Sequence, residues 1–150
     1  MAAVPYWEIR EGIRDALLAR PALAGATVDL VAGLDEAAEM SSPRVQIHIS
    51  DRTTPEDEQP AAAGKVTVFH VTAILAVIYF SMSSAEEAVR LCEGAVGEAE
   101  LALMADRTLG GRVETLWLLG GPMSYGKDPK GPMYAVAAIE LRVKAKARLD

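Results

Sequence analysis

Residues 65–80 read KVTVFHVTAILAVIYF and form the longest apolar stretch of the chain. Valine, isoleucine and threonine dominate this stretch, and such β-branched residues favour strands. It is interrupted by Thr67, His70 and Thr72 and is shorter than the ~20 residues that a membrane-spanning helix needs. The stretch therefore predicts a long strand. From Ala73 onward both faces of this strand are apolar, so we expect that end to be covered on both sides.

One helix is predicted before this strand and one after it. The first covers residues 6–20, where one helical face gathers the apolar side chains of Ile9, Ile13, Ala16 and Leu17. The second opens with a capping box, Ser84 followed by Glu87, and extends to about Ala105. Its expected buried stripe comprises Val89, Cys92, Val96, Ala99 and Leu103.

Four further strands are predicted, at residues 28–31, 44–50, 112–119 and 134–147. The element order is then α-β-β-β-α-β-β with long loops. Strands joined by short connections pair antiparallel, and the helices of such a fold gather on one face of the sheet. We therefore predict an α+β fold, with an antiparallel or mixed sheet and two main helices on one face. The length of 150 residues fits a single domain spanning 1–150.

Three connections stand out between these elements. An acidic, proline-bounded loop at residues 51–64 contains Glu56, Asp57 and Glu58. The Gly110-Gly111 pair predicts a left-handed cap after the second helix and a tight reversal into the next strand. A Gly/Pro loop at residues 120–132 is predicted to be flexible, or to become ordered against a partner.

Composition restricts the class of protein. Fifteen Lys and Arg against twenty-one Asp and Glu give a net charge of −6, which disfavours a nucleic-acid-binding module. The single cysteine excludes an intramolecular disulfide and a cysteine-based zinc site. The first residues, MAAVPYWE, lack the features of a secretory signal, so we expect a soluble intracellular protein without a membrane segment. Hydrophobic residues reach 51% although aromatics are only 5%, which leaves an aliphatic excess to explain.

The sequence lacks recognisable catalytic and cofactor-binding motifs. His48 is interpreted as a surface histidine, His70 as a sheet histidine and Cys92 as a core cysteine, because none of them lies in a metal-binding or nucleophile motif. Residues 120–127 contain glycines and a lysine, but their spacing is not that of a phosphate-binding loop and a strand follows them. We therefore expect no enzyme, no cofactor and no metal site.

A basic row marks the last predicted strand, where every second residue from Arg142 to Arg148 is cationic. Such a row could line a surface for DNA or for an acidic partner. Alternatively it could protect the edge of a sheet by charge, and Glu140 on the same face favours this second interpretation slightly.

Two segments carry a family resemblance: DRTLGGRV at residues 106–113, at the end of the second helix, and VAAIELRV at residues 136–143, in the last strand. With their element order, which covers most of the chain, they resemble the tail terminator (tail completion) proteins of tailed bacteriophages, the minor-tail-protein-U-like group. The resemblance implies a structural virion protein of a phage or phage-like particle. Proteins of this group form a ring, typically a hexamer, that caps the tail tube, ends tube polymerisation and joins the tail to the head connector.

The resemblance also implies partners and a location. These are other copies of the chain, the tail tube protein and the head-side connector or adaptor, with DNA passing through the lumen without specific binding. The location is the virion tail or neck, and the host cytoplasm during assembly. A head–tail adaptor or a tail tube subunit is the nearest alternative. A small α+β ligand-binding domain or enzyme is the alternative from another class.

Subunit contacts of a ring are heterologous, so two different patches must meet. The apolar end of the long strand, the long loops and the basic row are the candidates. The predicted interface residues are Glu56, Asp57, Glu58, Ile74, Ile78, Phe80, Met123, Tyr125, Lys127, Arg142 and Lys144.

Overall fold

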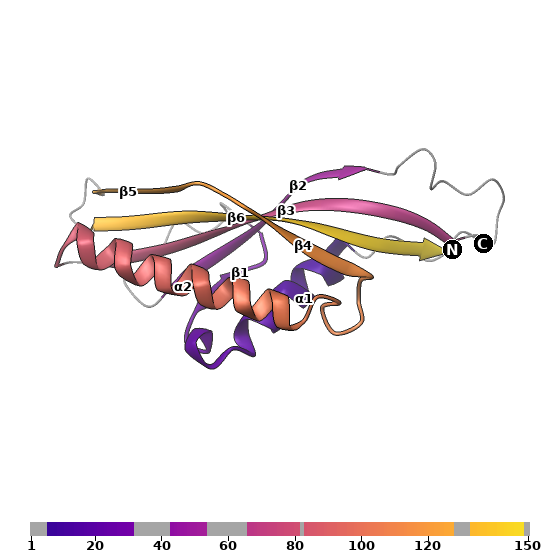
Figure 1. Ribbon diagram of the computed structural model, residues 1–150, viewed down its shortest axis with the longest axis horizontal. Helices are drawn as coiled ribbons and strands as arrows, with labels where there is room; N and C mark the ends of the chain where they lie inside the picture. The colour runs from indigo at the N-terminus through magenta and orange to yellow at the C-terminus, as the bar shows by residue number, and fades with distance from the viewer. Residues whose placement is uncertain (1–5, 32–42, 54–65, 82, 128–132, 149–150) are drawn as a thin grey trace.

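The computed structural model (Figure 1) describes residues 6–31, 43–53, 66–81, 83–127 and 133–148. It has the predicted α+β class, with two main helices and a mixed sheet. The elements in chain order are α1 (Tyr6–Leu18), the 3-10 helix η1 (Pro21–Leu23), β1 (Thr27–Asp29), β2 (Arg44–Thr53), β3 (Val66–Ser81), α2 (Ala85–Ala105), β4 (Thr115–Gly120), β5 (Met123–Lys127) and β6 (Met133–Arg148).

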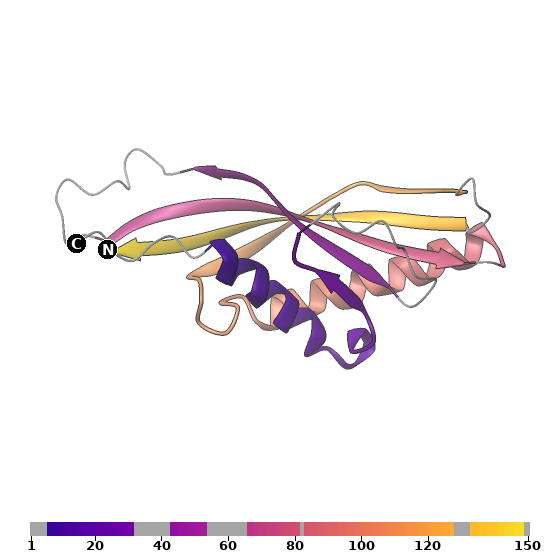
Figure 2. The same ribbon diagram turned by 180° about the vertical axis from the view of Figure 1, so that it is seen from behind.

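The sheet is built around the two longest strands, β3 and β6. They pair antiparallel over their full length, from Val66 opposite Arg148 to Ser81 opposite Met133. The strand order is β1-β2-β3-β6-β4, and β5 pairs with β6 as well. Only the short β1–β2 pair is parallel among the pairs in the described sheet. The sheet twists strongly along the length of these strands (Figures 1 and 2).

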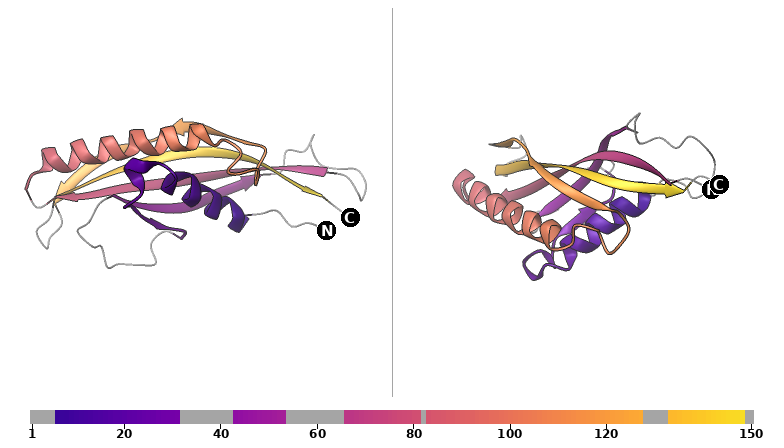
Figure 3. Two further views of the ribbon diagram at one scale, coloured as in Figure 1. Left: turned by 90° about the horizontal axis from the view of Figure 1, so that it is seen from below. Right: turned by 45° about the vertical axis from the view of Figure 1, so that its right-hand side comes forward.

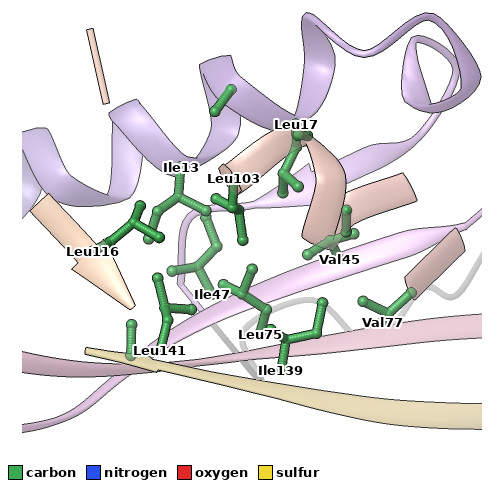
Figure 4. Packing of buried hydrophobic residues seen from close by; sticks show 14 of the residues in the cluster. Ile13, Leu17, Val45, Ile47, Leu75, Val77, Leu103, Leu116, Ile139 and Leu141 are labelled. Atoms are coloured by element: carbon green, nitrogen blue, oxygen red, sulfur yellow. The ribbon is translucent and has the colours of Figure 1, made fainter. Parts of the chain in front are cut away.

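Both helices lie side by side on one face of the sheet (Figures 1 and 3). The odd-numbered residues 71–77 of β3 and 135–145 of β6 point to this side and are buried, whereas the even-numbered residues of the same stretches are not. This is the period-2 alternation of a half-covered strand. The core side chains that fill the layer between sheet and helices include Ile13, Leu17, Ile47, Leu75, Leu103, Ile139 and Leu141 (Figure 4).

Helix α2 begins as predicted. The Ser84 hydroxyl accepts a hydrogen bond of 3.0 Å from the backbone N–H of Glu87, which satisfies one of the free donors of the first turn. Cys92, Ala99 and Leu103 of the predicted stripe are fully buried, while Val89 and Val96 are only partly buried against the core. The inner face of the helix is completed by Ala88, Ala95 and Ala102, whose small side chains bring the helix close to the sheet.

The apolar end of the long strand was expected to be covered on both sides, and the described elements cover one side of it. The helices cover the face formed by Ala73, Leu75 and Val77. On the opposite face Ile74 and Ile78 remain half-buried, and no element in the described part of the chain packs over them. Two-sided apolarity in the sequence is therefore not matched by two-sided burial among the described residues.

The Gly/Pro loop at residues 120–132 is also corrected in part, because residues 123–127 form the edge strand β5. Strands β4 and β5 pair with successive parts of the same edge of β6 and are joined by Gly121 and Pro122. A Cβ on Gly121 would lie 2.1 Å from the carbonyl oxygen of Ala138, and Pro122 accepts a hydrogen bond of 2.9 Å from the Ala138 N–H. Glycine is thus required where this edge bends across β6.

The predicted glycine cap of α2 lies elsewhere. The helix ends at Ala105 with Asp106 as its cap, and the left-handed residues come later, at Leu109 (φ 50°), Gly110 (φ 71°) and Gly111 (φ 86°). This turn packs on α1, where a Cβ on Gly12 would lie 2.8 Å from the Leu109 Cβ. The Leu-Gly-Gly turn therefore docks the end of α2 onto α1, and it does not cap α2.

The acidic residues Glu56, Asp57 and Glu58 lie outside the described residues. Within the described part of the chain, no helix has the length and apolarity needed to cross a membrane.

Candidate functional site

The surface of the sheet opposite the helices is the candidate site, and we call it the open face. Directly paired residues of an antiparallel sheet point to the same side. The β3–β6 register therefore places two rows of even-numbered residues next to each other on this face. Its cross-strand pairs are His70–Lys144, Thr72–Arg142, Ile74–Glu140, Ala76–Ala138, Ile78–Val136 and Phe80–Tyr134.

One end of the open face is apolar. This apolar end consists of Ala76, Ile78, Phe80, Tyr134, Val136 and Ala138. The rings of Phe80 and Tyr134 lie 6.3 Å apart between centroids and are tilted by 54°. All six residues are half-buried by their neighbours within the sheet. An apolar patch of this kind is typical of a surface that a partner covers.

The other end of the open face is basic, with Arg142, Lys144 and Lys146 at alternate positions of β6. Lys146 Nζ lies 3.0 Å from Glu114 Oε1. Arg142 and Lys144 have no acidic partner within the described residues. Because β4 pairs with β6 beside Arg142 and Lys144, these two cations do not protect a sheet edge, and the edge-protection interpretation is wrong for them. Lys146 lies beyond the last β4 pair, where β3 is the one strand paired with β6 among the described residues.

An aromatic pair borders this basic end. The rings of His70 and Trp117 stack with centroids 6.4 Å apart and an interplanar angle of 15°. Trp117 stands opposite Arg142 in the β4–β6 register and is 40% exposed. His48 is exposed on the same face, next to Ile74, as its interpretation as a surface histidine predicts. Sequence reasoning did not select Trp117, because it could not show that β4 lies beside the basic strand.

The helix side of the molecule has the opposite charge. Helix α2 carries five glutamates and one arginine. Arg20 of the segment after α1 forms an ion pair of 2.5 Å with Glu98. Leu101 and Met104, two apolar residues of α2, are 49% and 50% exposed. The helix layer thus offers a surface that is acidic and partly apolar, and it lies opposite a sheet face that is basic and partly apolar.

The predicted interface residues fall into three groups. Five of them, Ile74, Ile78, Phe80, Arg142 and Lys144, lie together on the open face. Met123, Tyr125 and Lys127 lie on β5 and pair with residues that point to the helix side. Tyr125 is 69% exposed there and borders a groove with Ala85, Val89 and Glu93 of α2. Glu56, Asp57 and Glu58 lie outside the described residues.

The thiol of Cys92 lies in the core and not on the open face. It is fully buried, and its Sγ lies 3.4 Å from the carbonyl oxygen of Val77. Burial raises the pKa of the Cys92 thiol to about 11, and the charge of Glu93 acts in the same direction. No cluster of three or more His, Cys, Asp or Glu side chains with metal-binding geometry occurs among the residues that the structure describes. Cys92 is a core residue, as its sequence position predicts.

The chain matches no protein-family model, and no curated protein gives a significant match.

Proposed function

We propose that the protein is a structural virion protein of a tailed phage or phage-like particle. In this proposal, copies of the chain assemble into a ring that caps the tail tube, ends tube polymerisation and joins the tail to the head connector. The observation that carries the proposal is the open face, which is apolar at one end and basic at the other and has no covering element in the described chain. The resemblance of residues 106–113 and 136–143 to tail terminators is the reason for proposing a tail-terminator ring rather than another assembly.

Energetics support an assembled state. Covering a large aliphatic or aromatic side chain fully contributes about 1.5–3 kcal/mol, and a half-buried one retains part of that gain. Ile74, Ile78, Phe80, Tyr134 and Val136 are all only half-buried in the single chain. Covering them upon association therefore offsets part of the entropy that ring formation costs. The aliphatic excess of the sequence is explained in the same way, as core together with interface.

Charge supports a lumen through which DNA moves freely. The chain has a net charge of −6, so a ring of such subunits is strongly acidic as a whole. Acidic residues that line the lumen repel the phosphate backbone and prevent the DNA from adhering. In this arrangement the basic end of the open face lies within subunit contacts and not in the lumen.

Two measurements test the proposed function. Light scattering after size exclusion should give a mass that is a multiple of 16.0 kDa and independent of concentration over the micromolar range. Electron microscopy of particles made without the protein should show overlong tails, because tube growth is no longer stopped. A strict monomer at high concentration together with tails of normal length would refute the proposal. Tails of normal length that stay separate from heads would indicate the head–tail adaptor instead.

A further inference from the structure

We propose that the open face of each copy is covered by the outward face of helix α2 of a neighbouring copy. This inference rests on the proposed ring and names the two surfaces that meet in it. The outward face of α2 is the side turned away from the sheet. Its residues are Arg90, Glu93, Gly94, Gly97, Leu101 and Met104, with Glu86 and Glu100 along its border.

Charge complementarity indicates that α2 of another copy is the surface that covers the open face. The open face presents Arg142 and Lys144, which have no acidic partner within the described chain. The outward face of α2 and its border carry three glutamates and one arginine, whereas Glu98 is already paired with Arg20. Glu93 and Glu100 lie seven residues apart, which places them on one side of the helix after two turns. When α2 of one copy contacts the basic end of another, these glutamates lie near Arg142 and Lys144. Such complementary charges favour this contact over others.

The glycines of α2 provide an independent argument. Gly94 and Gly97 lie in the middle of an exposed helix, where each costs roughly 1 kcal/mol relative to alanine. A Cβ at either position would meet no atom within 4 Å, so packing inside the chain does not require glycine there. Both positions permit a neighbouring backbone to approach the helix closely. At the centre of the open face, the paired residues Ala76 and Ala138 have small side chains that also permit a close approach.

The apolar groups also match. Leu101 and Met104 lie about one and two turns after Gly97 and are half-exposed on the same helix side. The open face supplies Ile74 and Ile78 on β3. A heterologous contact between the two surfaces buries apolar side chains from both copies.

Self-association of two open faces is the main alternative between copies, and charge argues against it. Two such faces with parallel strands would bring the Arg142 and Lys144 of both copies together. Two faces with antiparallel strands would bury these cations against the apolar end of the other copy. The first arrangement is repulsive, and the second removes unpaired charges from water. A helix-to-sheet contact avoids both costs.

A charge-reversal cycle tests the contact. One variant combines Arg142→Glu with Lys144→Glu on the open face, and a second combines Glu93→Lys with Glu100→Lys on α2. All four side chains lie outside the core, so folding should be retained, and circular dichroism checks this. Each variant alone should weaken association at least tenfold by light scattering over a dilution series. The variant with all four substitutions should regain association, because the charges again complement each other.

A matched control and a steric variant sharpen the test. Glu8→Lys with Glu11→Lys makes the same charge change on α1 and should leave the assembly mass unchanged. Gly97→Leu should preserve or raise the thermal midpoint of the isolated chain, since Gly97 is exposed and a Cβ there meets no atom within 4 Å. It should nevertheless weaken association at least tenfold.

Several outcomes would overturn the inference while the proposed function stands. One is a wild-type ring that survives both charge-reversal pairs and Gly97→Leu. Another is an α1 control that dissociates the ring as effectively as the α2 pair does. A third is an open-face variant that keeps the ring but loses binding to a 30-base-pair duplex, which would assign the basic end to DNA. A wild-type chain that is monomeric at every concentration refutes the ring itself.

Discussion

At the residue scale, the buried thiol of Cys92 links stability to pH. Its pKa of about 11 in the folded chain lies above that of an exposed thiol, so the native state keeps a proton that the unfolded chain loses. The free energy of unfolding should therefore be unaffected by this group below about pH 8. It should fall by up to about 3 kcal/mol as the pH rises from about 8.5 towards 11.

Urea denaturation of the wild type and of Cys92→Ala between pH 7 and pH 10.5 measures this contribution. The wild type should be the more stable of the two at pH 7, and the difference should shrink as the pH increases. Lysine and tyrosine titrations affect both proteins alike, which makes the difference specific to Cys92. Stability curves that run parallel across this range would show that the thiol is not held protonated by the fold.

At the element scale, the bend between β4 and β5 depends on Gly121. Gly121→Ala places a methyl group 2.1 Å from the Ala138 carbonyl oxygen in the middle of β6, and backbone cannot move aside there without breaking the pairing. We expect a loss of about 3 kcal/mol in the free energy of unfolding. Gly25→Ala is the matched control, because a Cβ at Gly25 meets no atom within 4 Å. It should change stability by less than about 0.5 kcal/mol, and equal losses at both sites would contradict the role of the bend.

The same strands show how far sequence periodicity reaches. Alternation correctly assigned the faces of β6, because hydrophobic and charged residues differ at every second position. It could not assign the neighbours of β6, since pairing depends on contacts between distant segments. The basic row was therefore attributed to an edge, although β4 pairs with β6 beside Arg142 and Lys144. β5 itself was missed because MSYGK has few strand-forming residues and is held in the sheet by its pairing with β6.

The sequence identified those candidate residues whose type or local pattern is unusual. Ile74, Ile78 and Phe80 were selected because an apolar second face is unusual in a sheet with helices on one side, and the structure leaves that face half-exposed. Trp117 and Tyr134 have no such local mark. Their place on the open face follows only from the register with β6 and β3. Long-range register is the information that a single sequence lacks.

At the scale of the whole molecule, the two sides of the sheet differ in charge and in burial. The helix side is acidic and contains the buried core of the described residues, whereas the open face is basic and apolar and is only half-buried. Variants on the open face should therefore separate assembly from folding.

Dilution of the wild-type protein should expose the apolar end. A dye that fluoresces on apolar surfaces, such as anilinonaphthalene sulfonate, should bind weakly to the assembled protein and several-fold more strongly per subunit below the dissociation concentration. The increase should follow the fall in mass measured by light scattering, while the circular dichroism spectrum stays constant. The variant with Arg142→Glu and Lys144→Glu should bind the dye strongly at all concentrations, because its apolar end stays uncovered. Dye binding that is constant while the mass falls would mean that Ile78, Phe80 and Tyr134 do not lie in the contact between copies.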